Sequence, residues 1–225
     1  MIVFLVCPVK IPDQKSSTLA GTYSKPPEPR SFLSAVLVLA SSSPYRRLLL
    51  DRLRVDYSVA SPDIDETPVA GEPPAGTARR LAELKARAVG ASFRDALVIG
   101  SDQVATLDGL ALGKPGNHAA ALAQLRLMRG RSVVFHTAVC VYDAARGDCR
   151  LEEVPTTVTF RQYSDAQAAR YLELEQPYDC AGSAKIEAMG IALVASVESS
   201  DPTALIGLPL IAVVSLLKQS GVEVL

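Results

Sequence analysis

Residues 97–115 read LVIGSDQVATLDGLALGKP. The apolar run at the start has the length of a buried strand, and this strand delivers one carboxylate, Asp102, at its end. The pair Asp108-Gly109 predicts a tight turn that sends the chain back toward Lys114. The proline after Lys114 biases this lysine toward extended backbone. The stretch therefore predicts a binding site rather than a piece of core.

The residue types in this stretch suit a bound polyphosphate. A carboxylate at the C-terminal end of a buried strand lies where open α/β sheets bind ligands, and its oxygens are hard ligands for Mg²⁺ or Mn²⁺. Lys114 adds a positive charge, and phosphoryl chemistry depends mainly on positioning and charge neutralisation. On these residues alone, a plain hairpin with Asp102 capping a loop and Lys114 in solvent fits equally well.

The composition limits the possible functions. The chain has 225 residues, 48% of them hydrophobic, which is enough for one sizeable core or two small lobes. Its 23 basic and 24 acidic residues give no basic excess, which argues against nucleic-acid binding. The four cysteines form no CxxC pair and only two histidines accompany them, so we expect reduced thiols and no zinc site.

The N-terminal segment differs in composition from the remainder. Residues 15–30 contain few apolar residues and include the proline-rich KPPEPR at 25–30, so residues 1–34 are expected to be a disordered leader or the product of a start codon assigned too early. The apolar residues 1–7 are too few to span a bilayer and lack a basic flank. We therefore expect a cytoplasmic protein without membrane association, whose single domain covers residues 35–225.

Folding is expected to begin with a buried strand at residues 35–40, followed by SSSPYRR at 41–47. Ser43 is a typical helix N-cap and Pro44 a typical first helical residue, so the next helix begins there and runs through Leu53. Arg46 lies in its first turn, where a cation opposes the helix dipole and needs a compensating anion. A bound phosphate would supply that anion. The alternative is a capped surface helix with solvated arginines.

Two charged residues before the Asp102 strand extend the predicted site. A helix at residues 77–92 carries Lys85 inside its apolar stripe, where a lysine either reaches the helix edge or contacts a buried anion. We expect the buried anion, because the next element is the strand that carries Asp102. The loop at 59–68 holds three carboxylates, and Glu66 completes a divalent-cation site if this loop lies over Asp102. Otherwise the loop is a solvated turn.

The rest of the chain alternates helices and strands and predicts an α/β fold. A helix is expected at residues 118–128, and a strand at 133–142 pairs with another at 156–160. A capping box opens a helix at 164–174, an apolar strand follows at 191–197, and the last helix ends near Gly221. His136, alone in an apolar strand, is expected to be a satisfied core residue.

Six short motifs together resemble the Maf family of nucleotide pyrophosphatases, and the resemblance covers the chain from residue 36 to its end. The motifs are residues 39–47 (LASSSPYRR), 61–66 (SPDIDE), 100–104 (GSDQV), 113–115 (GKP), 180–183 (CAGS) and 207–210 (GLPL).

The resemblance implies an α/β fold with a two-lobed mixed sheet around a central cleft, similar to that of the inosine triphosphatases, in a protein that is usually a homodimer. It implies hydrolysis of a nucleoside triphosphate to the monophosphate and pyrophosphate with a divalent cation, Mg²⁺ or Mn²⁺. By motif position, Asp102 matches the catalytic residue, and Asp102 and Glu66 match the metal site. Four further residues match the phosphate-binding positions: Ser41, Arg46, Lys85 and Lys114.

Within the family, the sequence resembles the branch that acts on 7-methyl-GTP. Gln103 and Glu187 carry this resemblance, and a carboxylate such as Glu187 can accept the two adjacent N–H donors of guanine. Tyr45 provides an aromatic face for a cationic methylated base, although tryptophan is expected at this position. The alternatives are the dTTP/UTP branch, or a non-catalytic nucleotide sensor in cell-division control. A sensor would be expected to have lost the acidic and lysine residues, which are present here.

Overall fold

The computed structural model describes residues 36–225. The predicted leader at 1–34 and the first residue of the predicted strand at 35–40 lie outside the described residues. The strands are β1 (Val36–Ala40), β2 (Ser58–Ala60), β3 (Ala96–Leu107), β4 (Leu110–Leu112), β5 (Ser132–Asp143), β6 (Asp148–Phe160) and β7 (Val194–Ser199). The α-helices are α1 (Pro44–Leu50), α2 (Pro74–Gly90), α3 (His118–Met128), α4 (Asp165–Glu175) and α5 (Leu210–Gln219). Short 3-10 helices are η1 (Asp51–Leu53), η2 (Ala181–Ser183), η3 (Met189–Leu193) and η4 (Ala204–Ile206).

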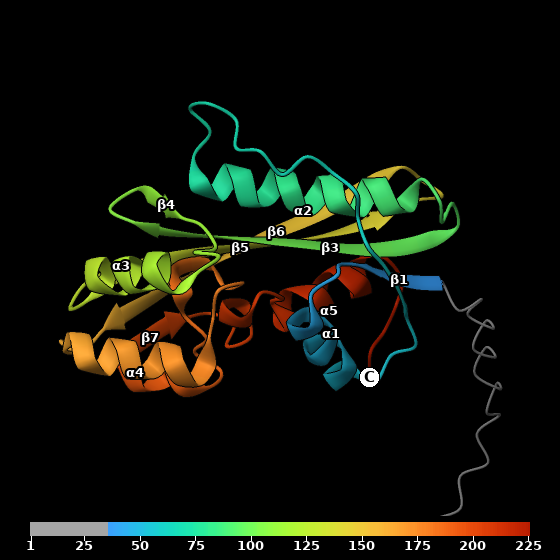
Figure 1. Cartoon of the computed structure of the whole chain (residues 1–225). Helices are drawn as coiled ribbons and strands as arrows, with labels where there is room; N and C mark the ends of the chain where they lie inside the picture. Colours follow the sequence, from blue (N-terminus) through green and yellow to red (C-terminus); the bar gives the residue numbers. More distant parts are fainter. Residues whose placement is uncertain (1–35) are drawn as a thin grey trace, which may run out of the picture. The chain divides into compact units, whose positions relative to one another are not determined.

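One mixed sheet organises these elements. The strand order is β2-β1-β3-β5-β6-β7, and β4 pairs with β3. β1 is parallel to β2 and β3, whereas the remaining pairs are antiparallel. α2 lies on one face of the sheet, and the other α-helices lie on the opposite face (Figure 1). The predicted α/β class with a mixed sheet is confirmed.

The alternation of side chains along β3 divides the core. Val98 joins an apolar cluster beneath α2, whereas Ile99 and Leu107 join two separate clusters on the other face, one with α5 and one with α3 and α4. On that second face the polar residues Ser101 and Gln103 lie between Ile99 and Leu107, because alternate residues of a strand point the same way. The two clusters are the cores of two lobes, as expected.

Asp102 lies in the middle of β3, so the prediction that it ends its strand is wrong. Pairing with β5 continues through Asp102, which is opposite Ala138, and keeps the strand extended. The neighbour β1 stops earlier, where Ala40 is opposite Gly100. On the same edge of β3, β4 begins to pair only at Ala105. Asp102 therefore lies in a gap between two strand neighbours, which leaves this edge open.

Most of the turns and helix starts that the sequence predicts are confirmed. Asp108 and Gly109 have φ values of 49° and 81° and form the tight turn between β3 and β4. Ser43 caps α1 by accepting a hydrogen bond from the backbone N–H of Arg46 at 3.4 Å. The capping box at the start of α4 is also present.

Several element boundaries differ from the prediction. α2 begins three residues early at Pro74, because proline in the first turn of a helix needs no N–H partner. α1 ends at Leu50, and η1 replaces the rest of the expected helix. The strand expected at 191–197 begins only at Val194, because η3 occupies the preceding residues. β6 begins at Asp148, before the expected 156–160, because its pairing with β5 extends to the turn.

Two polar features of the core agree with the sequence. Nδ1 of His136 lies 3.0 Å from Oε1 of Glu153, so this histidine is satisfied as expected. Among the described residues, Cys140, Cys149 and Cys180 are free thiols.

Gly100 allows α2 to approach β3 closely. A Cβ atom at this position would lie 2.2 Å from the carbonyl oxygen of Ala82 and 2.7 Å from the backbone nitrogen of Ala86. We expect Gly100→Ala to lower the free energy of unfolding by about 1–3 kcal/mol, because α2 must move away from the sheet. Urea denaturation measures the change. Gly113→Ala is the control, since its new Cβ meets no atom within 4 Å, and an equal loss there would contradict this account.

Candidate active site

Lys85 is the buried cation at the centre of the site. Its Nζ lies 2.6 Å from Oδ1 of Asp102 and 2.8 Å from Oε1 of Glu66. Lys85 is only 5% exposed and Asp102 only 7% exposed, so these charges have lost most of their water. Mutual pairing offsets that loss. The prediction that Lys85 contacts a buried anion is confirmed.

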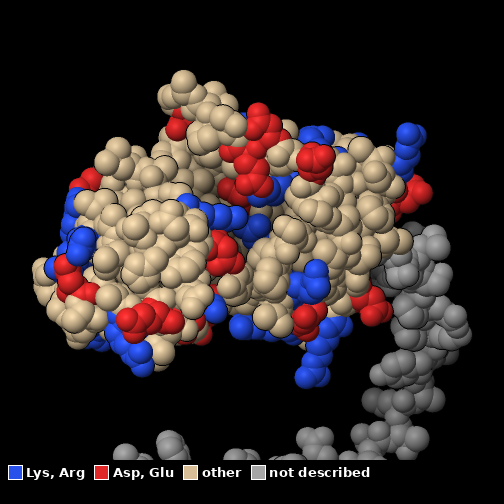
Figure 2. Space-filling view, viewed as in Figure 1, with Lys and Arg blue, Asp and Glu red and all other residues tan. Residues whose placement is uncertain are grey.

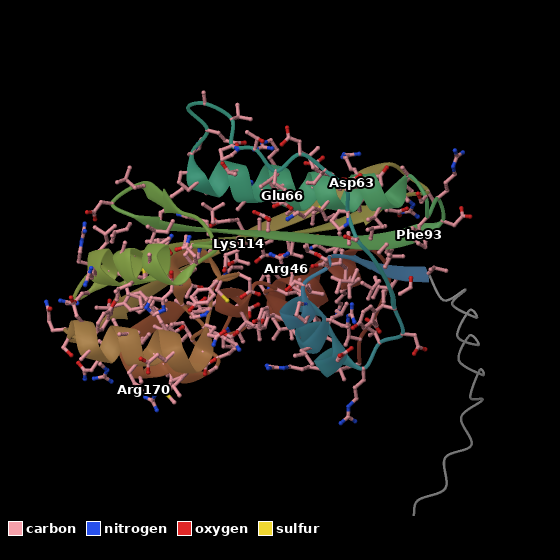
Figure 3. The ribbon with its side chains drawn as sticks, viewed as in Figure 1. Arg46, Asp63, Glu66, Phe93, Lys114 and Arg170 are labelled. Atoms are coloured by element: carbon pink, nitrogen blue, oxygen red, sulfur yellow. The ribbon has the colours of Figure 1, made fainter. Side chains whose placement is uncertain are left out.

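The loop before α2 brings Glu66 to the same ammonium as Asp102, which meets the condition for a shared cation site. Burial alone would raise the pKa of the Glu66 carboxyl, but the hydrogen bond and charge of Lys85 outweigh burial, and the pKa is lowered. The charges of Lys114 and Arg46 lower it further. Figure 3 shows Arg46, Glu66 and Lys114 around the middle of the sheet. Glu66 is therefore ionised at neutral pH among three cations.

Arg46 enters the site from the first turn of α1. Its Nε donates a hydrogen bond to the carbonyl oxygen of Gly207 at 2.8 Å, which fixes the guanidinium while its terminal nitrogens remain to bind an anion. Burial lowers the pKa of the Arg46 guanidinium, whereas the charges of Asp102 and Glu66 raise it. These carboxylates supply compensating negative charge for Arg46 in the protein itself. Gly207 has φ +113°, a conformation that favours glycine.

Ser41 lies at the end of β1 and is 3% exposed. Its Oγ accepts a hydrogen bond from the backbone N–H of Ser43 at 3.1 Å, so its own hydroxyl hydrogen remains to be donated. Lys114 follows β4 and is exposed to solvent. The termination of β1 and the return of β4 thus bring residues from both sides to the gap beside Asp102.

The polar residues between the two lobes hold the segment around η4. Nε2 of Gln103 lies 3.1 Å and 3.0 Å from the carbonyl oxygens of Ala204 and Leu205, and 2.8 Å from Oγ1 of Thr137. The Ser101 hydroxyl lies 2.9 Å from the Gly207 carbonyl oxygen. Because the amide hydrogens of Gln103 are used in these hydrogen bonds, its Oε1 is the atom that remains to contact a substrate. This bracing role was not apparent from the sequence.

The buried Asp201 was also missed. It is 2% exposed, and its Oδ1 accepts hydrogen bonds from the backbone N–H and the hydroxyl of Thr203, while Oδ2 accepts from the N–H of Ile211. Asp201 thereby closes the segment that presents the Gly207 carbonyl to Arg46. Asp followed by proline and threonine is a turn signal that could have indicated this role.

A second cluster of charges surrounds Tyr45. Burial raises the pKa of the Tyr45 hydroxyl, and the charges of Asp179 and Glu187 act in the same direction. Burial also raises the pKa of the Glu187 carboxyl. The charge of Lys185 lowers this pKa, whereas the charges of Glu175 and Asp179 raise it further. Lys185, two residues before Glu187, lies over the Tyr45 ring, so the segment that carries Glu187 lies next to Tyr45. Lys185 and Glu175 were missed, although Lys185 precedes Glu187 by two residues and lies in the same turn.

The residues around Asp102 fit a divalent cation that also contacts substrate. Asp102 and Glu66 converge on the same ammonium, so their hard oxygen atoms lie close together. Residues 36–225 contain no group of three or more His, Cys, Asp or Glu side chains able to hold a metal ion. Mg²⁺ is commonly bound by one or two carboxylates together with substrate phosphates, and this pair meets that requirement.

The surface carries mixed charge at the centre of the molecule. Figure 2 shows Lys, Arg, Asp and Glu side chains gathered in a hollow between its two halves. An anionic ligand with several negative charges suits the cations Arg46, Lys85 and Lys114. Across the described residues, no helix is both long and apolar enough to cross a membrane.

Lys85→Met is expected to lower the free energy of unfolding by about 3 kcal/mol, because it leaves a buried carboxylate without its partner. Urea denaturation at pH 7 measures the loss. Lys218→Met is the matched control, since Lys218 is a lysine of α5 whose side chain is 74% exposed. Equal stability of the two variants would contradict the role of the buried pair.

Glu187→Gln is expected to stabilise the protein at pH 7. The pKa of Glu187 is raised in the folded state, so its ionised form opposes folding above that pKa, and this cost disappears once pH falls below the ordinary value of 4.5. The gain should be about a few tenths of a kcal/mol, because a partly exposed charge is screened. Urea denaturation at pH 7 and pH 4 measures it. Glu173→Gln on the exposed side of α4 is the control, and a gain at pH 4 but not at pH 7 would contradict the assignment.

Comparison with known proteins agrees with this geometry. The chain is 61% identical over 185 residues to the 7-methyl-GTP pyrophosphatase of Cupriavidus metallidurans, which covers 82% of this chain and 93% of that protein. It is 59% identical over 189 residues to the 7-methyl-GTP pyrophosphatase of Methylobacillus flagellatus, covering 84% of this chain and 98% of the relative. The same name belongs to a relative from Thiobacillus denitrificans, 56% identical over 192 residues, or 85% of this chain and 96% of the relative.

A family model described as Maf-like protein matches residues 36–220. The match spans the whole described sheet and the residues gathered around Asp102. The chain therefore belongs to the Maf family.

Proposed function

We propose that this protein hydrolyses 7-methyl-GTP to 7-methyl-GMP and pyrophosphate, and so removes a modified nucleotide. The observation that carries the proposal is the convergence of Lys85, Glu66 and Arg46 with Asp102 in the gap between β1 and β4. The names of the relatives, at 56% to 61% identity, support the same activity.

The phosphate end of the substrate meets the cations. Arg46, Lys85 and Lys114 come from three different elements and offset the charge of the triphosphate. The buried hydroxyl of Ser41 donates a further hydrogen bond to a phosphate oxygen. Because Arg46 is held by the Gly207 carbonyl and Lys85 by its carboxylates, these groups are already oriented before the substrate binds.

Asp102 acts on the attacking water. Its Oδ1 is engaged by Lys85, so Oδ2 is the oxygen that accepts a proton from water. The water oxygen bonds to the α-phosphorus while the bond from that phosphorus to the bridging oxygen breaks. Pyrophosphate leaves with the electron pair of that bond. Lys85 keeps Asp102 oriented for this step.

The divalent cation, Mg²⁺ or Mn²⁺, is held in this proposal by Asp102 and Glu66. Bound there, it supplies neutralising charge to the substrate phosphates. In the structure the Lys85 ammonium contacts both carboxylates. A divalent cation bound there would therefore have to share these carboxylates with the ammonium.

The base end of the substrate meets Tyr45 and Glu187. The Tyr45 ring stacks on the base, and the attraction of an aromatic face for a cation favours a purine methylated at N7. The Glu187 carboxylate accepts the N1 and N2 hydrogens of guanine. The amide oxygen of Gln103, which its contacts around η4 do not use, contributes to binding of the base. The homodimer and the cytoplasmic location stay predictions.

Pyrophosphate release from 7-methyl-GTP, GTP, UTP and dTTP, each with Mg²⁺, Mn²⁺ or a chelator, tests the proposal. We expect the highest kcat/KM for 7-methyl-GTP and no turnover with the chelator. Asp102→Asn should reduce kcat by about 10²- to 10⁴-fold, since it removes the proton acceptor. Glu173→Gln, an exposed carboxylate of α4, is the control.

Other outcomes separate the alternatives. A preference for UTP or dTTP would keep the catalytic residues but reject the assigned base. Binding of nucleotides without turnover would indicate a sensor. Full turnover by a folded Asp102→Asn variant would reject the role of Asp102.

A further inference from the structure

Lys185 is held against the aromatic ring of Tyr45. Its Nζ lies 5.7 Å from the ring centroid and 3.4 Å from Oε2 of Glu175. Glu175 is fixed in turn, because its Oε1 accepts a hydrogen bond from the backbone N–H of Met189 at 3.0 Å. The Lys185 side chain is 26% exposed. The ammonium therefore lies over the ring on which a base would stack.

Lys185 and Glu187 place opposite charges at the same ring. They are the first and third residues of the turn that follows Ala184, in which the carbonyl oxygen of Lys185 accepts a hydrogen bond from the N–H of Ala188 at 3.2 Å. Each of the two side chains shifts the pKa of the other, and both act on Tyr45. The turn thus carries both a hydrogen-bond donor and a hydrogen-bond acceptor, and its donor lies over the Tyr45 ring.

This pair matches the order of groups on guanine. Guanine presents an acceptor at O6 next to donors at N1 and N2, whereas adenine presents a donor at N6. A lysine ammonium only donates and a carboxylate only accepts, so the pair fits guanine and opposes adenine. Methylation of N7 blocks the second acceptor beside O6, so O6 is then the acceptor left for a lysine.

We propose that Lys185 is a specificity-determining residue that donates a hydrogen bond to O6 of the substrate guanine, beside the contact of Glu187 with N1 and N2. The inference rests on the proposed function and adds to it. A base that stacks on Tyr45 moves the ammonium from the ring toward the edge of the base, and the flexible lysine stem allows this movement. Glu175 keeps the ammonium within reach of that edge.

A pair of substrates that differ only at the 6 position of the base tests the proposal. GTP carries O6, whereas 6-thio-GTP keeps the N1 hydrogen and the N2 amino group and carries sulfur, a weaker hydrogen-bond acceptor, at this position. For the wild-type protein we expect kcat/KM for GTP to exceed that for 6-thio-GTP about tenfold, because a charged hydrogen bond is weakened. Lys185→Met should bring this ratio close to one. Urea denaturation of the variant shows that it is folded.

Three further variants sharpen the result. Lys185→Arg keeps charged donors and should retain most of the ratio. Glu175→Gln weakens the anchor of Lys185 and should give an intermediate ratio. Lys218→Met removes an exposed lysine of α5 and should leave the ratio unchanged.

Two results would overturn the inference, and they differ in what else they reject. If Lys185→Met keeps the wild-type ratio of kcat/KM values, the role of Lys185 is rejected and the proposed function is unaffected. A wild-type protein that releases pyrophosphate from neither GTP nor 7-methyl-GTP overturns the proposed function together with it.

Discussion

The buried ammonium of Lys85 constrains the structure on both sides of the sheet. A lysine with this little exposure needs partners of opposite charge, and Asp102 of β3 and Glu66 of the preceding loop are those partners. The lysine reaches them because α2 packs closely on β3, where Gly100 has no side chain to hold the helix away. Helix packing and site assembly therefore depend on the same contact.

The gap on the edge of β3 explains why the site lies where it does. β1 has ended before Asp102 and β4 pairs only after it, so the residues that follow β1 and β4 meet at this point. The other face of β3 presents Ser101 and Gln103 between the two lobes, where they bind the carbonyl groups of the segment around η4. That segment returns to Arg46 through Gly207. One strand thus supplies the carboxylate of the proposed site and the support for its arginine.

The two ends of the proposed substrate meet environments of opposite sign. Arg46, Lys85 and Lys114 gather at one end, where charge neutralisation favours the triphosphate. Glu175, Asp179 and Glu187 gather around Tyr45 at the other, with Lys185 as the cation among them. A nucleotide with an anionic tail and a cationic base is complementary to this distribution, and the orientation of the bound substrate follows from it.

The sequence by itself determined the α/β class, the capped helix after β1, the turn at Asp108-Gly109 and the need of Lys85 for a buried anion. Each of these features depends either on interactions between residues close together in the chain or on the spacing of apolar residues, which the local sequence shows directly. Only the tertiary structure decided that Asp102 lies in mid-strand, that Gln103 braces η4 and that Lys185 lies over Tyr45. These features depend on where neighbouring strands stop and on contacts between segments more than a hundred residues apart in the chain, and no local pattern encodes such long-range pairing.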